Sequence, residues 1–299
     1  MTLLPLCLIL ASGISHAVWN LAVKRAGAGG SAFVWLYSAV AVVIYTPSVL
    51  WLVATGRINL GFLSAGAIAI SSLGQLVYYL LLQKAYSLGD LSVVYPVARG
   101  SGPLLLVGAA MLLLGERPSA VALAGAAAVV VGVLIVGARR VSGSTAATGN
   151  ADAARVRLPI SADVAFGLAA GVLIAACNLW DARTVSVLAV SPILLEWVFN
   201  GTRVVVLGAG VLRRRGVLAQ LWREHRYNAL VVGVLMPLSY ILALWSFTLA
   251  SISMLAPIRE VSIVVACLLS WCLLSEPQPV RRLLGAAVVL TGVFALALA

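Results

Sequence analysis

The chain has 299 residues, of which 63% are hydrophobic and 10% are charged, and its mean hydropathy is +1.10. A soluble domain of this size could not bury so much apolar surface, so the composition excludes an ordinary globular protein. The formal net charge of +11 does not indicate nucleic-acid binding, because the basic residues stand mainly in short stretches between apolar runs.

Apolar runs of about 20 residues recur along the chain, and each is long enough to cross a hydrocarbon core of ~30 Å. The first run has no basic residues before it and continues past Ser15-His16-Ala17. We therefore interpret it as a membrane span rather than a cleaved signal peptide. The pattern predicts an all-α integral membrane protein with ten spans, at 3–23, 33–54, 62–83, 91–114, 119–138, 163–180, 191–212, 228–249, 254–274 and 280–298.

A polar stretch at 139–162, rich in Ser, Thr and Gly, is predicted to be a flexible linker. It divides the spans into two sets of five. We expect a first five-helix repeat at 1–138 and a second at 163–299.

The two halves repeat one another. At a constant offset of 160 residues Arg99 matches Arg259, and the same offset relates the following pairs: Glu116 and Glu276, Gly125 and Gly285, Ala126 and Ala286, and Gly132 and Gly292. Gly13 and Asn20 match Gly171 and Asn178 at a slightly smaller offset. An odd number of spans in each half places the second half upside down relative to the first, the inverted-repeat architecture of many secondary transporters.

The basic residues predict the orientation of the spans. Loops on one face carry only Arg57, Arg117 and Arg183. The opposite loops carry Lys24, Arg25, Lys84, Arg139, Arg140, Arg155, Arg157, Arg213, Arg214, Arg215, Arg223, Arg226, Arg281 and Arg282. Because cytoplasmic loops are rich in Lys and Arg, both termini are predicted to lie outside. We expect a multi-pass protein of the bacterial inner membrane.

Three features resemble the drug/metabolite transporter superfamily, in its ten-span branch with two EamA domains. The first span carries His16-Ala17-Val18-Trp19-Asn20 followed by Lys24. The fourth and ninth spans run from Tyr95-Pro96 to Gly115-Glu116 and from Ala256-Pro257 to Ser275-Glu276, and the fifth and tenth open on a Leu-x-Gly-Ala pattern with a second glycine seven residues on.

The resemblance implies a secondary transporter of a small organic metabolite, with a central cavity lined by spans 1, 3, 4, 6, 8 and 9. It does not imply a particular substrate, because substrates vary widely across the superfamily. The short multidrug members carry an acidic residue in the first span for binding cations, whereas this span has His16 and no acid. Export of lipophilic cations is therefore not expected.

Two arginines inside predicted spans indicate the chemistry of the substrate. A charge at such depth is costly and usually faces a cavity or a partner. The planar guanidinium groups of Arg99 and Arg259 suit a carboxylate, phosphate or phosphonate. The alternative is internal pairing with an acid such as Glu260, which follows Arg259, or Glu196.

Further residues are candidates for the same site. Pro96, Pro103 and Pro257 are expected to break the helices that carry the two arginines. His16 and Glu260 are candidate proton carriers. Amphipathic lining of the cavity is expected from Asn20, Asn178, Tyr79, Tyr240 and Trp245.

The sequence contains none of the motifs that assemble a nucleophile with a base in a membrane enzyme, so we expect no enzyme activity, no metal and no cofactor. The expected partners are a small-molecule substrate, protons and the lipid bilayer, with no nucleic acid and no required oligomer. A lipid or lipid-linked flippase and a non-transporting membrane scaffold remain as alternative functions.

Overall fold

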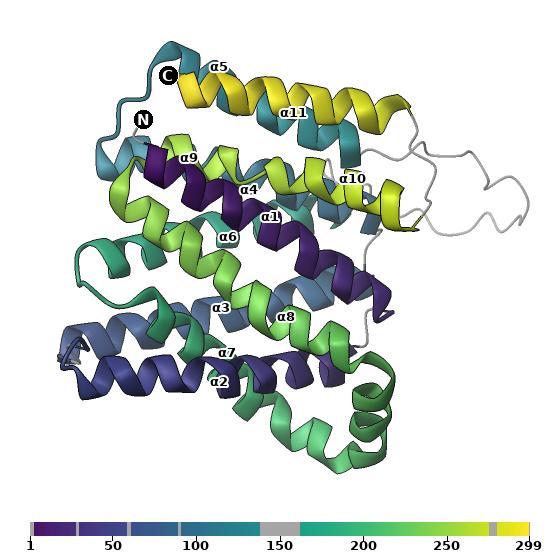
Figure 1. Cartoon of the computed structure of the whole chain (residues 1–299). Helices are drawn as coiled ribbons and strands as arrows, with labels where there is room; N and C mark the ends of the chain where they lie inside the picture. The colour runs from purple at the N-terminus through teal and green to yellow at the C-terminus, as the bar shows by residue number, and fades with distance from the viewer. Residues whose placement is uncertain are drawn as a thin grey trace, which may run out of the picture.

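The computed structural model describes residues 3–27, 30–58, 61–88, 91–137, 162–274 and 280–298, and every regular element among them is a helix. The helices stack side by side into one bundle, with the two termini at the same end (Figure 1). The predicted linker at 139–162 lies outside the described residues, apart from Ala162, which begins a helix.

The helices follow the predicted spans closely. Their bounds are α1 (Leu3–Arg25), α2 (Gly30–Ala54), α3 (Phe62–Leu88), α4 (Leu91–Leu114), α5 (Ala120–Gly137), α6 (Ala162–Ser186), α7 (Pro192–Val211), η1 (Leu212–Arg214), α8 (Arg215–Leu249), α9 (Ile252–Ile258), α10 (Val261–Leu274) and α11 (Val280–Leu298).

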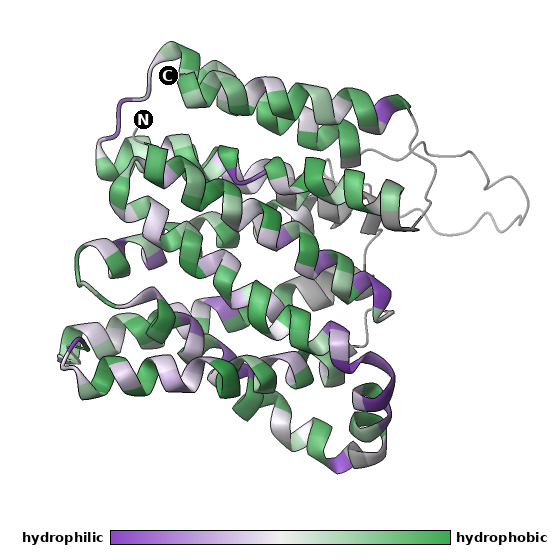
Figure 2. Ribbon diagram, in the orientation of Figure 1, coloured by the Kyte–Doolittle hydropathy of each residue, from purple (hydrophilic) through white to green (hydrophobic). Residues whose placement is uncertain are grey.

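Seven of the helical segments in the described part of the chain are long and apolar enough to cross a membrane, and three shorter apolar helices lie at 100–113, 120–136 and 283–298. Helices suit this environment because all their backbone hydrogen bonds are internal. Figure 2 shows hydrophobic residues along most of the bundle, with hydrophilic residues gathered where α1 ends and α8 begins. The prediction of an all-helical membrane protein is therefore confirmed by length and composition.

Two helix boundaries differ from those predicted. We expected the sixth span to end at 180, but α6 continues to Ser186 and carries Asp181 with it. We expected a loop at 213–227, but η1 and the first turns of α8 occupy it, with non-helical backbone at His225 where the polar start of α8 meets its apolar part. A hydropathy pattern does not detect helical segments that are rich in polar residues, although such residues can form a helix.

The ninth predicted span is broken. A turn at Arg259 and Glu260 separates α9 from α10, and Pro257 lies in the last turn of α9. Proline has no amide to donate to the carbonyl four residues earlier, so the helix is weakened at this point. The prediction for α4 was wrong, because this helix runs unbroken from Leu91 to Leu114 through Pro96 and Pro103.

Close glycine contacts join α5 to α11. A Cβ built on Gly125 would lie 2.9 Å from the carbonyl oxygen of Gly292, and one on Gly132 would lie 2.7 Å from that of Gly285. The reverse contacts hold as well, at 2.6 Å from Gly292 to Gly125 O and 2.9 Å from Gly285 to Gly132 O. Small residues therefore let these two backbones touch.

A second pair of glycines makes related contacts. Gly13 of α1 lies against Val261 and Ser262 at the start of α10, and Gly171 of α6 lies against Ser101 and Gly102 of α4. The two contacts are equivalent, because Gly13 matches Gly171 in sequence and Ser101 and Gly102 match Val261 and Ser262. The helix pairs α1 with α8 and α6 with α3 are in contact in the same reciprocal way.

Candidate functional site

A cavity of about 440 Å³ lies among α1, α3, α4, α6, α7, α8 and the α9–α10 turn. Its polar and charged lining includes His16, Asn20, Gln75, Asn178, Glu196, Arg203, Tyr240, Arg259 and Glu260. Along α1 it extends through His16, Trp19, Asn20 and Val23, toward the helix end that carries Lys24 and Arg25. A polar chamber within an apolar bundle is the usual form of a solute site in a membrane.

Arg259 enters this cavity from the turn between α9 and α10. Its Nη2 donates to Ser239 Oγ at 3.4 Å, and its guanidinium carbon lies 5.5 Å from the centre of the Tyr240 ring. Ser239 is itself fixed to α1, because its hydroxyl donates to Ser12 O at 2.9 Å and Ser12 Oγ donates to Ser239 O at 2.6 Å. The helix break therefore presents a held cation to the chamber.

A second group of polar side chains surrounds the hydroxyl of Tyr240. That oxygen lies 2.7 Å from Asp181 Oδ2 and 3.0 Å from Asn178 Oδ1, both on α6. Gln75 of α3 donates from Nε2 to Asp181 Oδ2 at 3.1 Å. Asp181 is completely buried. Because three helices contribute to it, this network depends on the tertiary fold.

A third group lies along α7, where Glu196, Asn200 and Arg203 are all buried. Asn200 Nδ2 donates to Glu196 Oε2 at 3.0 Å, and Arg203 Nη1 lies 3.5 Å from Asn200 Oδ1. The acid and the base are thus linked through an amide on one helix face, and both line the cavity. The described lining therefore carries charges of both signs.

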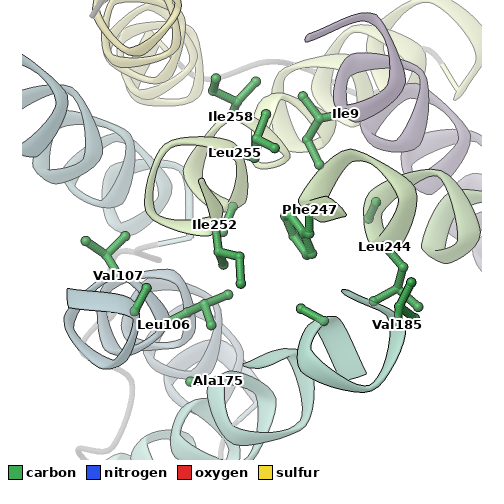
Figure 3. Packing of buried hydrophobic residues seen from close by; sticks show 14 of the residues in the cluster. Ile9, Leu106, Val107, Ala175, Val185, Leu244, Phe247, Ile252, Leu255 and Ile258 are labelled. Carbon is green, nitrogen blue, oxygen red and sulfur yellow. The ribbon is translucent and has the colours of Figure 1, made fainter. Parts of the chain in front are cut away.

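Apolar side chains close the end of the bundle where α4 ends and α9 begins. Figure 3 shows buried side chains from α1, α4, α6, α8 and α9 around a common region of the bundle. The labelled members of this buried cluster, called the apolar seal below, are Ile9, Leu106, Val107, Ala175, Val185, Leu244, Phe247, Ile252, Leu255 and Ile258. Leu106 and Phe247 of this cluster also line the cavity, so buried apolar side chains bound it on this side, while its lining continues along α1 toward the other end.

Glu116 fastens the same end. It follows α4, and its carboxylate accepts the backbone amides of Ile252 at 3.0 Å and Ser253 at 2.9 Å in the first turn of α9. Ser251 precedes that turn without making a side-chain cap. Glu116 thus satisfies amide groups that the helix start leaves open and places a negative charge at the positive end of the helix.

The structure brings most of the predicted site residues together. Those that line the cavity are His16, Asn20, Asn178, Tyr240, Arg259, Glu260 and Pro103. Asn20 also donates to His16 O at 2.7 Å, within α1. Arg99 and Pro96 lie in α4, but their side chains are outside the described part of the structure, so the predicted Arg99–Arg259 pair is not tested.

Two predicted lining residues lie elsewhere. Trp245 borders a separate shallow depression with Trp51 and Arg57. It stands five residues from Tyr240, which on a helix turns it about 140° away from the cavity; Phe247 stands seven residues on and returns to the cavity face. Tyr79 is also absent from the lining, where its neighbour Tyr78 is found instead.

Sequence reasoning missed Asp181 and Gln75. Asp181 was placed in a loop because the sixth span was predicted to end one residue before it. Its spacing of three residues from Asn178 would put both on one helix face, which is the signal that could have revealed it. Gln75 is a polar residue in the middle of an apolar run, a position that is costly without a partner.

The candidate metal-ligating residues are dispersed: in the described part of the chain, no three His, Cys, Asp or Glu side chains form a group that could hold a metal ion. The groups around the cavity are suited to reversible binding and to protonation. Arginine, amide and hydroxyl groups can hold a polar solute, and buried carboxyl groups can take up or release protons.

Comparison with known proteins shows the fold alone. A solved structure described only as "Crystal structure of protein" has a TM-score of 0.69 at 14% sequence identity, and the similarity covers 98% of this chain and 96% of that chain. No family model matches the sequence, and no curated protein matches it. The bundle is therefore an architecture that occurs elsewhere, shared over nearly its whole length.

Proposed function

We propose that the protein is a secondary transporter of a small organic metabolite that carries an anionic group. The observation that carries this proposal is the polar cavity inside an apolar helical bundle, with Arg259 presented to it by a helix break. Discontinuous helices at a central site are a recurring device of transporters, since they bring charge and free backbone groups to the solute.

The proposed architecture is ten spans in two inverted repeats, and the glycine contacts support it. Gly125 matches Gly285 in sequence, and Gly132 matches Gly292. The contact between Gly125 and Gly292 therefore has its counterpart in the contact between Gly285 and Gly132. A two-fold axis in the membrane plane would produce this correspondence. The resemblance to the ten-span EamA branch of the drug/metabolite transporters leads to the same proposal, and the bacterial inner membrane is its expected location.

Alternating access explains the unequal ends of the cavity. The apolar seal and Glu116 close the end where α9 begins, which the distribution of basic residues assigns to the outside. The structure would then correspond to an inward-open state. We expect opening of this end to break the contact of Glu116 with Ile252 and Ser253.

An anionic substrate follows from the arginines. A residue eight positions into a span lies ~12 Å below its entry surface. In a core of ~30 Å, Arg99 and Arg259 would then lie ~6 Å apart along the membrane normal. Two cations this close repel unless acids or an anion lie near them, and Glu196 and Glu260 offset part of the charge in the described lining. A carboxylate, phosphate or phosphonate between the arginines would offset the remaining positive charge.

Transport by purified protein in liposomes tests the proposal, with a panel of labelled carboxylates, amino acids, phosphate esters and phosphonates. The Arg259→Gln variant is expected to lose uptake of the active compound, and Arg259→Lys to retain part of it, because lysine keeps the charge without the fork of donors. Arg57→Gln is the matched control, since Arg57 lies outside the cavity beside Trp51. Normal uptake by Arg259→Gln, or a preference for organic cations, would show that the anion proposal is wrong.

A further inference from the structure

Asp181 is a buried acid that takes no part in the substrate contacts proposed above. Its side chain has no solvent exposure, and its Oδ1 has no hydrogen-bond partner in the described part of the structure. Its Oδ2 receives Gln75 Nε2 at 3.1 Å and lies 2.7 Å from the Tyr240 hydroxyl. Both of these partners meet Oδ2, so Oδ1 lacks the donors that a buried ionised carboxylate normally collects, although the Ser71 hydroxyl of α3 also faces this carboxyl group.

The Tyr240 hydroxyl can form hydrogen bonds to Asp181 and Asn178 whether Asp181 is protonated or ionised. The group has one proton to donate, yet it lies within hydrogen-bond distance of two acceptors, Asp181 Oδ2 and Asn178 Oδ1. If Asp181 is ionised, Tyr240 donates to Asp181, and a half-turn of the Asn178 amide lets its nitrogen donate to the tyrosine oxygen. If Asp181 carries a proton, Asp181 donates to Tyr240, Tyr240 donates to Asn178, and both short contacts become hydrogen bonds.

The other charged, titratable and polar groups around this site come from five helices and from the turn between α9 and α10. Cys177 stands on α6 itself, and Glu196 of α7 is close enough to interact electrostatically with Asp181. Tyr240 is on α8, and the guanidinium group of Arg259 lies over its ring. On α3 the facing groups are Ser71 and Gln75. The helix α4, which packs along α6, carries Arg99.

We propose that Asp181 is the proton-binding site of this transporter, with Tyr240 connecting it to the substrate cavity. The proposal rests on the proposed transport function and adds the coupling ion to it. In the state described, the O–H bond is on Asp181 Oδ2. On release, that proton passes to the Tyr240 oxygen while Tyr240 gives its own proton to water in the cavity, which leaves an aspartate and a hydronium ion.

The position of Arg259 links this step to the substrate. Its guanidinium lies over the Tyr240 ring, 5.5 Å from the ring centre, and so contributes positive potential beside the hydroxyl relay. An anion bound to Arg259 would neutralise that potential. Substrate arrival and the charge state of Asp181 are therefore coupled through one tyrosine, without direct contact between the substrate and Asp181.

Infrared spectroscopy of the protein in liposomes tests the proton site without any substrate. A protonated carboxyl group gives a C=O band that is distinct from that of a carboxylate. We expect this band at neutral pH in the wild-type protein, and we expect Asp181→Asn to remove it. Glu196→Gln and Glu260→Gln are expected to keep it. Labelling aspartate with carbon-13 should shift the band in the unmutated protein, so the assignment does not depend on a variant that folds.

Coupling is tested on the compound that proves active in the transport panel. In the wild-type protein a pH gradient is expected to drive accumulation of the compound against its own concentration gradient, by about tenfold per pH unit for one coupled proton. Asp181→Asn should abolish this accumulation while retaining exchange of labelled for unlabelled compound. Absence of the aspartic acid band, stabilisation by Na⁺ that needs Asp181, or undiminished accumulation by Asp181→Asn would each overturn the proposal. If no compound is transported but the band is present, the transport function fails and the proton site stands.

Discussion

Tyr240 joins the two polar groups of the cavity. Its hydroxyl meets Asp181 and Asn178 on α6, and its ring meets Arg259 at the helix break. Few side chains can serve an apolar wall and a polar network at once, and tyrosine does so because only one end of it is polar. The residue therefore connects elements that the sequence places far apart.

We expect Tyr240→Phe to destabilise the protein by about 1–3 kcal/mol, because it leaves a buried carboxyl group without its nearest partner. The measurement is thermal unfolding of the purified protein in detergent, where each kcal/mol lowers the midpoint by roughly 2–4 °C. Tyr227→Phe is the control, since Tyr227 is 71% exposed. Equal midpoints for the two variants would show that the network contributes nothing to stability.

The short helix α9 is the element on which gating is expected to depend. It has seven residues and no side-chain cap of its own, and its first amides are held by Glu116 from the end of α4. A helix this short has little stability in isolation. Its position therefore depends on contacts with other elements, which makes it suitable for movement between two states.

Removing this contact should favour opening of the sealed end. Loss of an N-terminal cap costs about 0.5–2 kcal/mol, which corresponds to roughly a 2- to 30-fold change in an equilibrium constant. We expect Glu116→Ala to raise by that factor the rate at which an impermeant thiol reagent outside the cell labels Ala110→Cys. Ala110 is fully buried in the same apolar cluster as the seal.

The background for this measurement lacks Cys7, Cys177, Cys267 and Cys272. Glu224→Ala serves as the control, because Glu224 lies exposed in the first part of α8 and accepts from Gln220. An unchanged labelling rate in Glu116→Ala, with the reporter still reactive in detergent, would mean that Glu116 only stabilises the local fold.

The whole molecule has two chemically different ends. Basic residues gather where α1 stops and α8 starts, among them Lys24, Arg25, Arg223 and Arg226, and Figure 2 shows hydrophilic residues there. The cavity extends toward this end, while the apolar seal closes the other. The positive-inside tendency of membrane proteins predicts that this end faces the cytoplasm.

Labelling of single cysteines measures this orientation in intact cells. Thr55→Cys, in the exposed turn between α2 and α3, should react with an impermeant thiol reagent added outside. Gln220→Cys, exposed in the first part of α8, should react only after the membrane is permeabilised. The reverse pattern would place the termini inside, and the cavity would then open outward.

The sequence by itself determined the class of protein and most of its helices. Helix bounds such as 91–114 and 280–298 match the predicted spans because a bilayer demands about twenty apolar residues in each crossing. It also identified Arg259 and Pro257 as unusual, since charge and proline are costly in such helices. These inferences are local: they depend on residue type and spacing along one helix.

Only the tertiary structure decided which polar residues meet. Asp181, Gln75 and Tyr240 come from α6, α3 and α8, and no pattern within one helix predicts that their side chains lie within hydrogen-bond distance. Only the structure shows that the helix is interrupted at Arg259, between α9 and α10, while α4 is continuous through the matching part of the first half. Helix formation in a membrane follows from composition, whereas rotation, tilt and contact depend on how whole helices fit together.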